Sequence, residues 1–538
     1  MRKKLIFLWI FILTFTMLPG CGREEDPNRP VIDPNKTQIN VHVSGGGYGR
    51  EWLDKAARDW EAEPGNEKYQ IIPYVNSDED YLVMENDIKN GTGQDIYFLS
   101  HPVISNLING DYLVDLSDTI EEDIPGESES IRDKMKYPEI NDRAFRNREG
   151  EGCYAIPYGD SFTGFIFDFE LFRDNGWLLT DSDGNLTVGR DGKPGTYDDG
   201  QPDTIAEWDA MIQKILIETN TYPFIYNTTV PGYETGLIDS LFYQYAGEEE
   251  YRTFLEYSGE ITVDTASGGT EKITVSKEDG YKVYGSTGLR IAMEFADKYL
   301  TNNQSWIYPK AYQTTQYSHT DAQKDFLFNF EPTAANPQAA LLHEGIWWEN
   351  ESRTRGFQTL ENRGYPERGY GKREYRIMLY PRIDGQKETK SVLSALDCGA
   401  TFVVKSKDAA KQEKMLDFLK YTTKDKYLKG FTLSNGSVRP YKYTLTEGEL
   451  ATLTPFQRNV WAIANDTENV TIIRPDMQAR SSPFVGTSSK LDRYISRSAS
   501  GANYTQPFAG LMRVTAAEYI DGMKYYNESN WTKWLGGN

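Results

Sequence analysis

The first residues that suggest ligand chemistry form a glycine-rich loop. Residues 41–63 run from a short apolar stretch, VHVS, through four glycines in five residues into an evident helix. A phosphate-binding loop needs Lys-Ser/Thr after its last glycine, but an Arg-Glu pair stands there, and its glutamate would repel a phosphate at the helix N-terminus. Because glycine lets the backbone approach a ligand closely, we predict that Gly46 and Gly47 offer N–H groups to ligand hydroxyls and that Tyr48 offers a ring face. A tight turn without a ligand is the alternative.

A second candidate pair follows the apolar run DIYFL, which has the character of a strand. Ser100 and His101 then stand at the carboxyl end of a parallel strand, where α/β proteins bind their ligands. We predict that both residues contact the ligand, with a solvated loop as the alternative.

Acidic residues at metal-ligand spacing occur in a glycine-rich segment, residues 181–203, which we call the acidic insert. Its first residues alternate oxygen ligands like the first half of a calcium loop, but Gly192 stands where the bidentate glutamate is expected. The candidate ligands for a structural calcium are Asp181, Asp183, Asn185, Asp191, Asp198 and Asp199. A solvated acidic loop without metal is the alternative.

Alternating strand and helix patterns must position these residues. Trp52, Ala56 and Trp60 recur at four-residue spacing and predict a helix with one apolar stripe. The strand-like runs at 69–75 and 95–100 enclose a helical segment, a spacing that indicates a parallel α/β sheet. Aromatic residues make up 13% of the chain, which favours a ligand with flat apolar faces.

The N-terminus has the pattern of an export signal. A basic start, MRKK, precedes a thirteen-residue apolar run, too short for a membrane span and typical of a signal peptide at 1–20. The run ends at LPGC, which resembles a bacterial lipobox, so we predict lipidation at Cys21 followed by a flexible tether through residue 37. An ordinary secretory signal is the alternative.

Charge and cysteine content narrow the class of partner. The formal net charge of −22 repels nucleic acid and anionic lipid, so we expect a neutral or cationic ligand or another protein.

Besides Cys21 the chain has Cys153 and Cys398, which we expect to be buried free thiols. Whether these two cysteines pair is left open.

Five stretches resemble, in their order, family 1 extracellular solute-binding proteins, the sugar-capturing lipoproteins of bacterial ABC importers. They are GGGYGREWLDKAARDWE, YAIPYGDSFTGFIFDFELFRDNGW, TIAEWDAMIQKI, ALLHEGIWWENES and KMLDFLKYTTKDKYLKGFTLSNGSVRPY. The resemblance covers nearly the whole mature chain. It implies an α/β, two-lobe, type II periplasmic-binding-protein-like fold, with parallel-type sheets flanked by helices and a ligand cleft between the lobes. It assigns 38–160 plus 387–433 to lobe one and 161–386 plus 434–538 to lobe two, with crossings near Asp160, 383–387 and 433–437.

The resemblance also implies ligand-binding residues. Trp347 and Trp348 are both candidates, but adjacent residues point in different directions, so we expect only one of them to face the cleft. The family pattern of glycine, one residue, tryptophan favours Trp347 as the platform for a sugar ring. Two core tryptophans are the alternative. Further candidates are the pair at the first crossing and the pair in a lobe-two loop, namely Asp160, Ser161, Tyr233 and Glu234.

The function that the resemblance implies is capture of a mono- or oligosaccharide by lobe closure and delivery to ABC permease subunits. The chain is then a monomeric, non-catalytic protein on the outer face of the bacterial cell membrane, needing no cofactor beyond a structural calcium. Motifs for catalysis are incomplete: GDSFTG has its second glycine one residue too far for a nucleophile elbow, and HEGIW lacks the second histidine of a zinc helix. The alternatives are a carbohydrate-active surface enzyme and a binding protein for a non-sugar solute.

Overall fold

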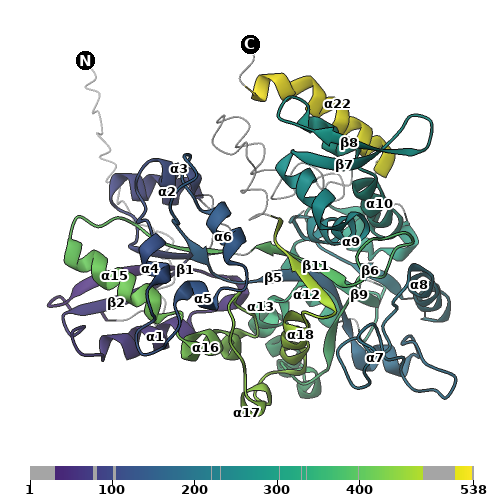
Figure 1. Cartoon of the computed structure of the whole chain (residues 1–538). Coiled ribbons are helices and arrows are strands. Elements are labelled where there is room, and N and C mark those ends of the chain that lie inside the picture. The colour runs from purple at the N-terminus through teal and green to yellow at the C-terminus, as the bar shows by residue number, and fades with distance from the viewer. Residues whose placement is uncertain are drawn as a thin grey trace, which may run out of the picture.

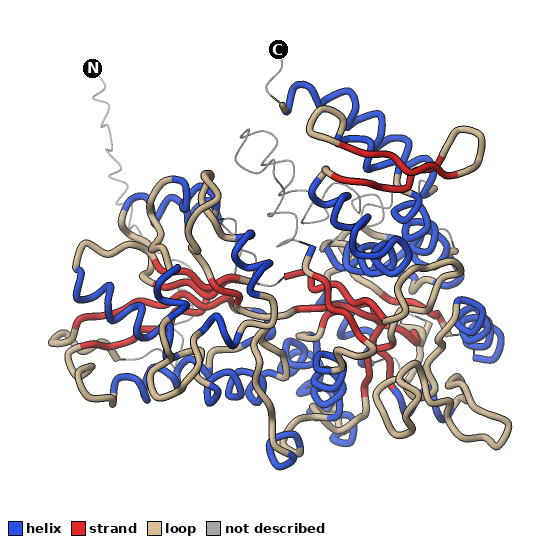
Figure 2. Tube along the Cα trace, in the orientation of Figure 1, coloured by secondary structure: helices blue, strands red, loops and turns tan. Residues whose placement is uncertain are grey.

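The chain folds into two lobes that stand side by side, each built around its own sheet (Figures 1 and 2). The computed structural model describes residues 31–76, 81–100, 104–219, 221–230, 232–301, 303–328, 330–334, 336–397, 399–475 and 515–535. The predicted signal peptide, Cys21, His101 and Cys398 lie outside these ranges. No helix within them is long and apolar enough to cross a bilayer. The predicted two-lobe α/β fold is confirmed.

Lobe one contains a five-stranded sheet in the order β2–β1–β3–β12–β4. Its strands are β1 (Thr37–Ser44), β2 (Tyr69–Asn76), β3 (Ile96–Leu99), β4 (Ile156–Pro157) and β12 (Ala400–Val403). Strand β1 runs parallel to β2 and β3, whereas β12 is antiparallel to β3 and β4. The helices are α1 (Glu51–Glu61), α2 (Tyr81–Asn90), α3 (Ser105–Asn109), α4 (Ser117–Glu121), α5 (Ile131–Lys134), α6 (Pro138–Ala144), α15 (Ala409–Tyr421) and α16 (Asp425–Asn435).

Helix α1 shows how the sequence pattern builds this lobe. Trp52, Ala56 and Trp60 are buried on one face, as their spacing predicts. The Trp60 indole N–H donates to the carboxylate of Asp417 at 2.8 Å, which joins α1 to α15. The buried stripe fixes the direction in which α1 leaves the glycine loop.

Lobe two contains a mixed sheet in the order β13–β11–β5–β9–β6, with β10 also paired to β5. Its strands are β5 (Ser161–Asp168), β6 (Tyr222–Ile225), β9 (Ala339–Gly345), β10 (Tyr375–Met378), β11 (Ser391–Asp397) and β13 (Val470–Ile473). Pairs β6–β9 and β11–β13 are parallel, but β5 is antiparallel to β9, β10 and β11. The sheet is therefore only partly of the parallel type that the sequence pattern predicted.

Helices cover both faces of the lobe-two sheet, and a two-stranded hairpin packs on two of these helices rather than on the sheet. The α-helices are α7 (Phe169–Asp174), α8 (Ile205–Thr219), α9 (Gly232–Glu256), α10 (Thr287–Ala296), α11 (Pro309–Gln313), α12 (His319–Leu327), α13 (Trp348–Ser352), α14 (Gln358–Asn362), α17 (Glu447–Leu450) and α18 (Pro455–Asn465). Short 3-10 or π turns occupy η1 (Gly46–Tyr48), η2 (Gly280–Gly285), η3 (Asp297–Thr301), η4 (Gln304–Trp306), η5 (Arg353–Phe357) and η6 (Pro366–Arg368). Helix α22 (Ala516–Trp534) lies beside the hairpin of β7 (Gly259–Asp264) and β8 (Thr270–Val275) (Figure 1).

The chain passes between the two sheets at three places. The first lies between β4 and β5, where Asp160 stands. The second lies between β11 and β12, so β11 belongs to lobe two and the predicted boundary at 387 comes before this strand. At the third, Tyr441 still pairs with Met135 of lobe one, whereas α18 already packs on β10 of lobe two, so the crossing falls after the predicted 433–437. A strand's own residues do not specify which sheet it joins, which explains the difference.

Candidate functional site

Loops at the carboxyl ends of strands from both lobes meet at one place. In lobe one, η1 follows β1; in lobe two, Trp347 and α13 follow β9. The Asn350 side-chain amide donates to the Gly47 carbonyl oxygen across the junction. A Cβ built on Gly47 would lie 2.6 Å from Trp347 Cβ, so this close approach requires glycine. The structure thus brings together Gly47 and Trp347, which are far apart in the sequence, at the sheet edges where α/β proteins bind ligands.

Tyr48 joins the lobes through its hydroxyl rather than through an open ring face. Its ring is buried and stacks on Phe431 with centroids 5.8 Å apart. The hydroxyl is hydrogen-bonded to the hydroxyl of Ser161 at the start of β5, and Asn435 donates to the Tyr48 carbonyl oxygen at 2.8 Å. The apolar ring therefore packs in the core of lobe one, and the prediction that Tyr48 offers a ring face to a ligand stays a prediction.

The two adjacent tryptophans have different surroundings. Trp348 is fully buried and packs edge-to-face against Tyr375 and Phe456, the surroundings of a core residue, and its contact with a ligand stays a prediction. Trp347 is half-buried at the lobe junction, and its ring meets the Tyr233 ring edge-to-face at 5.4 Å. A Cβ on Gly345 would lie 2.0 Å from the Trp347 ring, so glycine at this position lets the indole lie against the strand end.

A buried polar network lies behind Trp347. The Gln323 side-chain amide donates to the carboxylates of Glu344, at 3.1 Å, and Glu351, at 2.7 Å. The Ser352 hydroxyl donates to the Gln323 carbonyl oxygen at 2.8 Å. Burial, followed by the charge of Glu351, raises the pKa of Glu344 to about 8. At neutral pH this network therefore holds Glu344 largely as the neutral acid, able both to donate and to accept hydrogen bonds.

Tyr233 and Glu234 open helix α9, which begins beyond the carboxyl end of β6. Both residues are buried. Among the described residues, no group other than its own backbone N–H donates a hydrogen bond to the Glu234 carboxylate. Burial raises the pKa of Glu234 well above its ordinary value, and the charge of Glu344 raises it further. The sequence predicted a lobe-two loop at this point, but the two residues lie in the first turn of a helix, and their contact with a ligand stays a prediction.

The remaining predicted ligand contacts have other partners. Asp160 is buried in a bidentate ion pair with Arg474, with oxygen–nitrogen distances of 2.9 and 2.6 Å. The Ser100 backbone N–H donates to the Ser44 hydroxyl at 2.9 Å, which places Ser100 beside the end of β1. Gly46 forms part of η1, and His101 lies outside the described ranges. Ligand contact by Ser100 and Asp160 stays a prediction.

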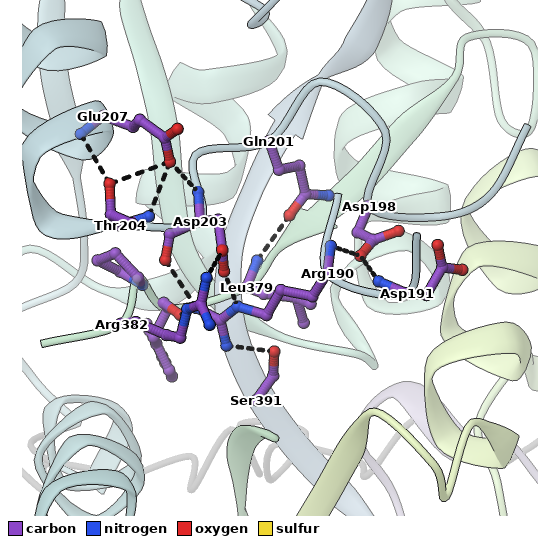
Figure 3. Close-up of polar contacts among 12 residues, drawn as sticks. Arg190, Asp191, Asp198, Gln201, Asp203, Thr204, Glu207, Leu379, Arg382 and Ser391 are labelled. Carbon is purple, nitrogen blue, oxygen red and sulfur yellow. Dashed lines mark hydrogen bonds and ion pairs between the residues drawn. The ribbon is translucent and has the colours of Figure 1, made fainter. Parts of the chain in front are cut away.

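The carboxylates of the acidic insert accept hydrogen bonds from the insert itself (Figure 3). Asp198 accepts from the backbone N–H groups of Arg190, at 2.7 Å, and Asp191, at 3.2 Å. Asp181 and Asp199 likewise accept backbone N–H groups of their own turns. Across the described residues, no group of three or more His, Cys, Asp or Glu is arranged to hold a metal ion. This geometry gives the calcium prediction no support.

Arg190 attaches the insert to the lobe-two sheet (Figure 3). Its guanidinium pairs with the Asp203 carboxylate and donates to the Ser391 hydroxyl at 2.5 Å and to the Tyr380 carbonyl oxygen at 2.7 Å. Glu207 accepts the backbone N–H groups of Asp203 and Thr204, each at 2.9 Å, at the start of α8. These contacts hold the insert against the lobe-two sheet as a structural loop. The sequence analysis did not single out Arg190.

Sequence reasoning also missed the residues that complete the junction. Gln323, Glu344, Asn350 and Glu351 come from α12, β9 and α13. Three of them lie in or next to the segment HEGIWWENES, so the signal was present, but only the tryptophans were singled out. A separate hollow of about 810 Å³ lies on lobe one between α1, α4 and α15, lined in part by Lys414, Lys420 and Lys424, and does not reach the junction.

Together, the two sheets and their facing loops define the class: a two-lobe α/β fold of the periplasmic-binding-protein type. No protein-family profile matches the sequence, and no curated protein matches it. In structure the chain is similar to a probable secreted solute-binding lipoprotein from Streptomyces coelicolor (13% identity, 92% of this chain, 100% of that chain, TM-score 0.54). It is also similar to the sugar-binding protein MalE from Xanthomonas citri (13% identity, 92% of this chain, 98% of that chain, TM-score 0.57). A third similar structure is an ABC substrate-binding protein from Listeria monocytogenes in complex with cycloalternan (14% identity, 94% of this chain, 100% of that chain, TM-score 0.52). These likenesses show the fold.

Proposed function

We propose that this chain is a non-catalytic solute-binding protein that captures a mono- or oligosaccharide between its lobes. The observation that carries the proposal is the meeting of the Gly47 and Trp347 loops, each at a strand carboxyl end of a different lobe. A half-buried indole at such a junction offers an apolar face to the CH groups of a sugar ring, and neighbouring carboxyl and amide groups offer hydrogen bonds to its hydroxyls. The proteins of similar fold named above bind sugars or other solutes.

The proposal extends to where the protein works. The lipobox-like LPGC places a lipid anchor at Cys21, and the chain then acts as a monomer on the outer face of the cell membrane. There it passes its sugar to the permease subunits of an ABC importer. Lipid anchoring and the permease partner are supported by the sequence resemblance alone, and mass spectrometry of the protein purified from membranes tests the anchor directly.

Thermal unfolding of residues 22–538 against a panel of mono- and oligosaccharides tests sugar binding. A sugar at 100 times its Kd adds about 2.7 kcal/mol to the free energy of unfolding and raises Tm by several degrees. Trp347→Ala removes a stacking contact worth roughly 2 kcal/mol per sugar ring, which weakens binding about thirtyfold. Trp461→Ala is the matched control, because Trp461 is also half-buried and packs on one tyrosine, Tyr443.

Two outcomes contradict the proposal. If no sugar in the panel raises Tm, the ligand is not a carbohydrate of these classes. If a sugar raises Tm equally in the wild type and in Trp347→Ala, the sugar binds elsewhere than at the junction. Incubation with oligosaccharides followed by chromatography separates binding from catalysis, because released products would show that the protein is an enzyme.

A further inference from the structure

A buried carboxyl group without a partner stands on the lobe-two side of the junction. Glu234 is 1% exposed, and among the described residues only its own backbone N–H acts on its carboxyl oxygens as a hydrogen-bond donor. Most buried polar side chains in native proteins are hydrogen-bonded, since leaving one unsatisfied costs about 1–3 kcal/mol and more for a charged group. An unpartnered carboxyl group at a binding junction therefore points to a partner that the ligand supplies.

The position of Glu234 ties it to the proposed site. It follows Tyr233, whose ring contacts Trp347, in the first turn of α9. Helix α9 packs against β9, the strand that carries Glu344 three residues before Trp347, and the charge of Glu344 raises the pKa of Glu234. The loop that leads into α9 supplies a second polar group, because the buried Asn227 amide nitrogen has no hydrogen-bond partner among the described residues.

The charge around these carboxyl groups is one-sided. Within the described residues, no lysine or arginine forms an ion pair with Glu234, Glu344 or Glu351. Among the described residues, the basic side chain that approaches the group is His319, whose Nε2 lies 3.5 Å from a Glu351 oxygen and whose pKa is raised chiefly by its hydrogen bond to Glu351. The other titratable groups that face the cluster are the hydroxyls of Tyr233 and Tyr380, which supply no positive charge.

We propose that the carboxyl groups of Glu234 and Glu344 bind an ammonium group of the ligand, so that the site prefers amine-bearing solutes, and amino sugars in particular. An ammonium donates three hydrogen bonds and accepts none, so it complements two carboxyl groups that form no ion pair with a lysine or arginine of the described residues and that ionise when the ammonium binds. The net charge of −22 attracts cationic solutes toward the protein. The preference for amino sugars rests on the proposed carbohydrate function, whereas recognition of an ammonium group does not.

Ligand binding then releases protons. Glu344, whose pKa is raised to about 8, is largely protonated below neutral pH in the free protein. A bound ammonium beside it lowers that pKa, because an opposite charge at close range favours the ionised form. The carboxyl group loses its proton to solvent as the ammonium binds, whereas a neutral ligand gives no such release.

Isothermal titration calorimetry with matched trisaccharides tests the inference. Three β-1,4-linked trimers share one glucose backbone and differ at C2: glucosamine carries an amine, N-acetylglucosamine an acetamide, and cellotriose a hydroxyl. At about pH 6 we expect the amine trimer to bind at least about tenfold more tightly than the other two, a difference typical of one charge-assisted contact. Titrations in two buffers of different ionisation enthalpy should show proton release for the amine trimer alone.

Substitutions assign the preference to named residues. Glu234→Gln keeps the shape of the side chain and removes its ability to ionise when the ammonium binds, so we expect the ratio of amine to hydroxyl trimer affinity to fall close to one. Glu250→Gln is the matched control, because Glu250 is a buried carboxylate on the same helix that already has Lys387 and Thr262 as partners. In that variant the ratio should remain at the wild-type value, and circular dichroism checks that both variants fold.

The outcomes separate this inference from the proposed function. Equal binding of the three trimers by the wild type, or an unchanged ratio in Glu234→Gln, overturns amine recognition and leaves the carbohydrate function standing. If no trimer binds but spermidine does, and Glu234→Gln abolishes its binding, amine recognition is supported without its sugar component. If neither the trimers nor spermidine bind, amine recognition is wrong, and the panel of mono- and oligosaccharides decides the carbohydrate proposal separately.

Discussion

The buried ion pair between Asp160 and Arg474 permits a sharp test of how the lobes are held together. Asp160 stands at the first crossing between lobes, and Arg474 follows β13 of lobe two. Both side chains are 2% exposed, and the guanidinium also lies 3.6 Å from the ring centre of Tyr137 in lobe one. Replacing the arginine with methionine keeps much of the side-chain volume and leaves the Asp160 carboxylate buried without its cation.

The expected cost follows from this burial. Removing one partner of a buried ion pair destabilises a protein by about 3–5 kcal/mol, because the remaining charge is uncompensated. The double variant Asp160→Asn/Arg474→Met removes that charge, so we expect it to recover at least about half of the loss. Lys298→Met is the control: the Lys298–Asp209 pair is exposed, so its removal should cost about 1 kcal/mol or less.

Urea denaturation followed by tryptophan fluorescence measures these differences, and ligand titration of Asp160→Asn completes the test. A cost below about 1 kcal/mol for Arg474→Met would refute the reasoning, since it would mean that the pair is solvated or replaced by other contacts. A loss of ligand affinity in Asp160→Asn without a loss of stability would show that Asp160 contacts the ligand, as the sequence predicted, and that its pairing with Arg474 gives way on binding.

Three further predictions follow from the junction and its surroundings. Trp348→Ala should lower the free energy of unfolding by about 3–5 kcal/mol, as for other buried aromatics, with little change in ligand affinity once folded, and calorimetry with titration separates the two effects. Gly47→Ala places a Cβ against Trp347, so the lobes should separate. X-ray scattering should then show a larger radius of gyration, and ligand titration should show at least about tenfold weaker binding. Burial raises the pKa of Glu344 to about 8 and that of Glu349 to about 7, so the folded state binds more protons than the unfolded state between about pH 5 and pH 8. The free energy of unfolding should therefore fall as pH rises through this range, by at most about 1.4 kcal/mol per pH unit per group. The fall should be less steep in Glu344→Gln. Wild-type pH dependence equal to that of Glu344→Gln would contradict this assignment.

Local patterns in the sequence predicted local structure well. The four-residue spacing of Trp52, Ala56 and Trp60 gave the buried face of α1, because helical geometry alone decides which residues share a face. The glycine loop and Trp347 were recognised as candidates because the local sequence alone shows where an apolar strand-like run ends and a loop begins. What the sequence did not specify is that these two loops touch, since that depends on how the lobes are placed.

Features that depend on distant partners were missed for the same reason. The apolar run of β11 fits either sheet, and only its pairing with β5 and β13 assigns it to lobe two. The network of Gln323, Glu344 and Glu351 joins a helix, a strand and a second helix, and no single stretch of sequence contains it. The aromatic ring of Tyr48 is equally consistent with a platform and with a core, and only the structure shows that it packs against Phe431.

The strand pairing near the first two crossings has a mechanical consequence. Strand β12 pairs antiparallel with β4 in lobe one, and β11 pairs antiparallel with β5 in lobe two. The segments that join β4 to β5 and β11 to β12 therefore leave each sheet as neighbours, and Asp160 on the first of them pairs with Val438, on the segment that leads to the third crossing. Neighbouring connections of this kind resist stretching and sideways shear more than bending, so we expect the lobes to swing about one axis that passes through them. The two binding loops should then meet in the same way at each closure.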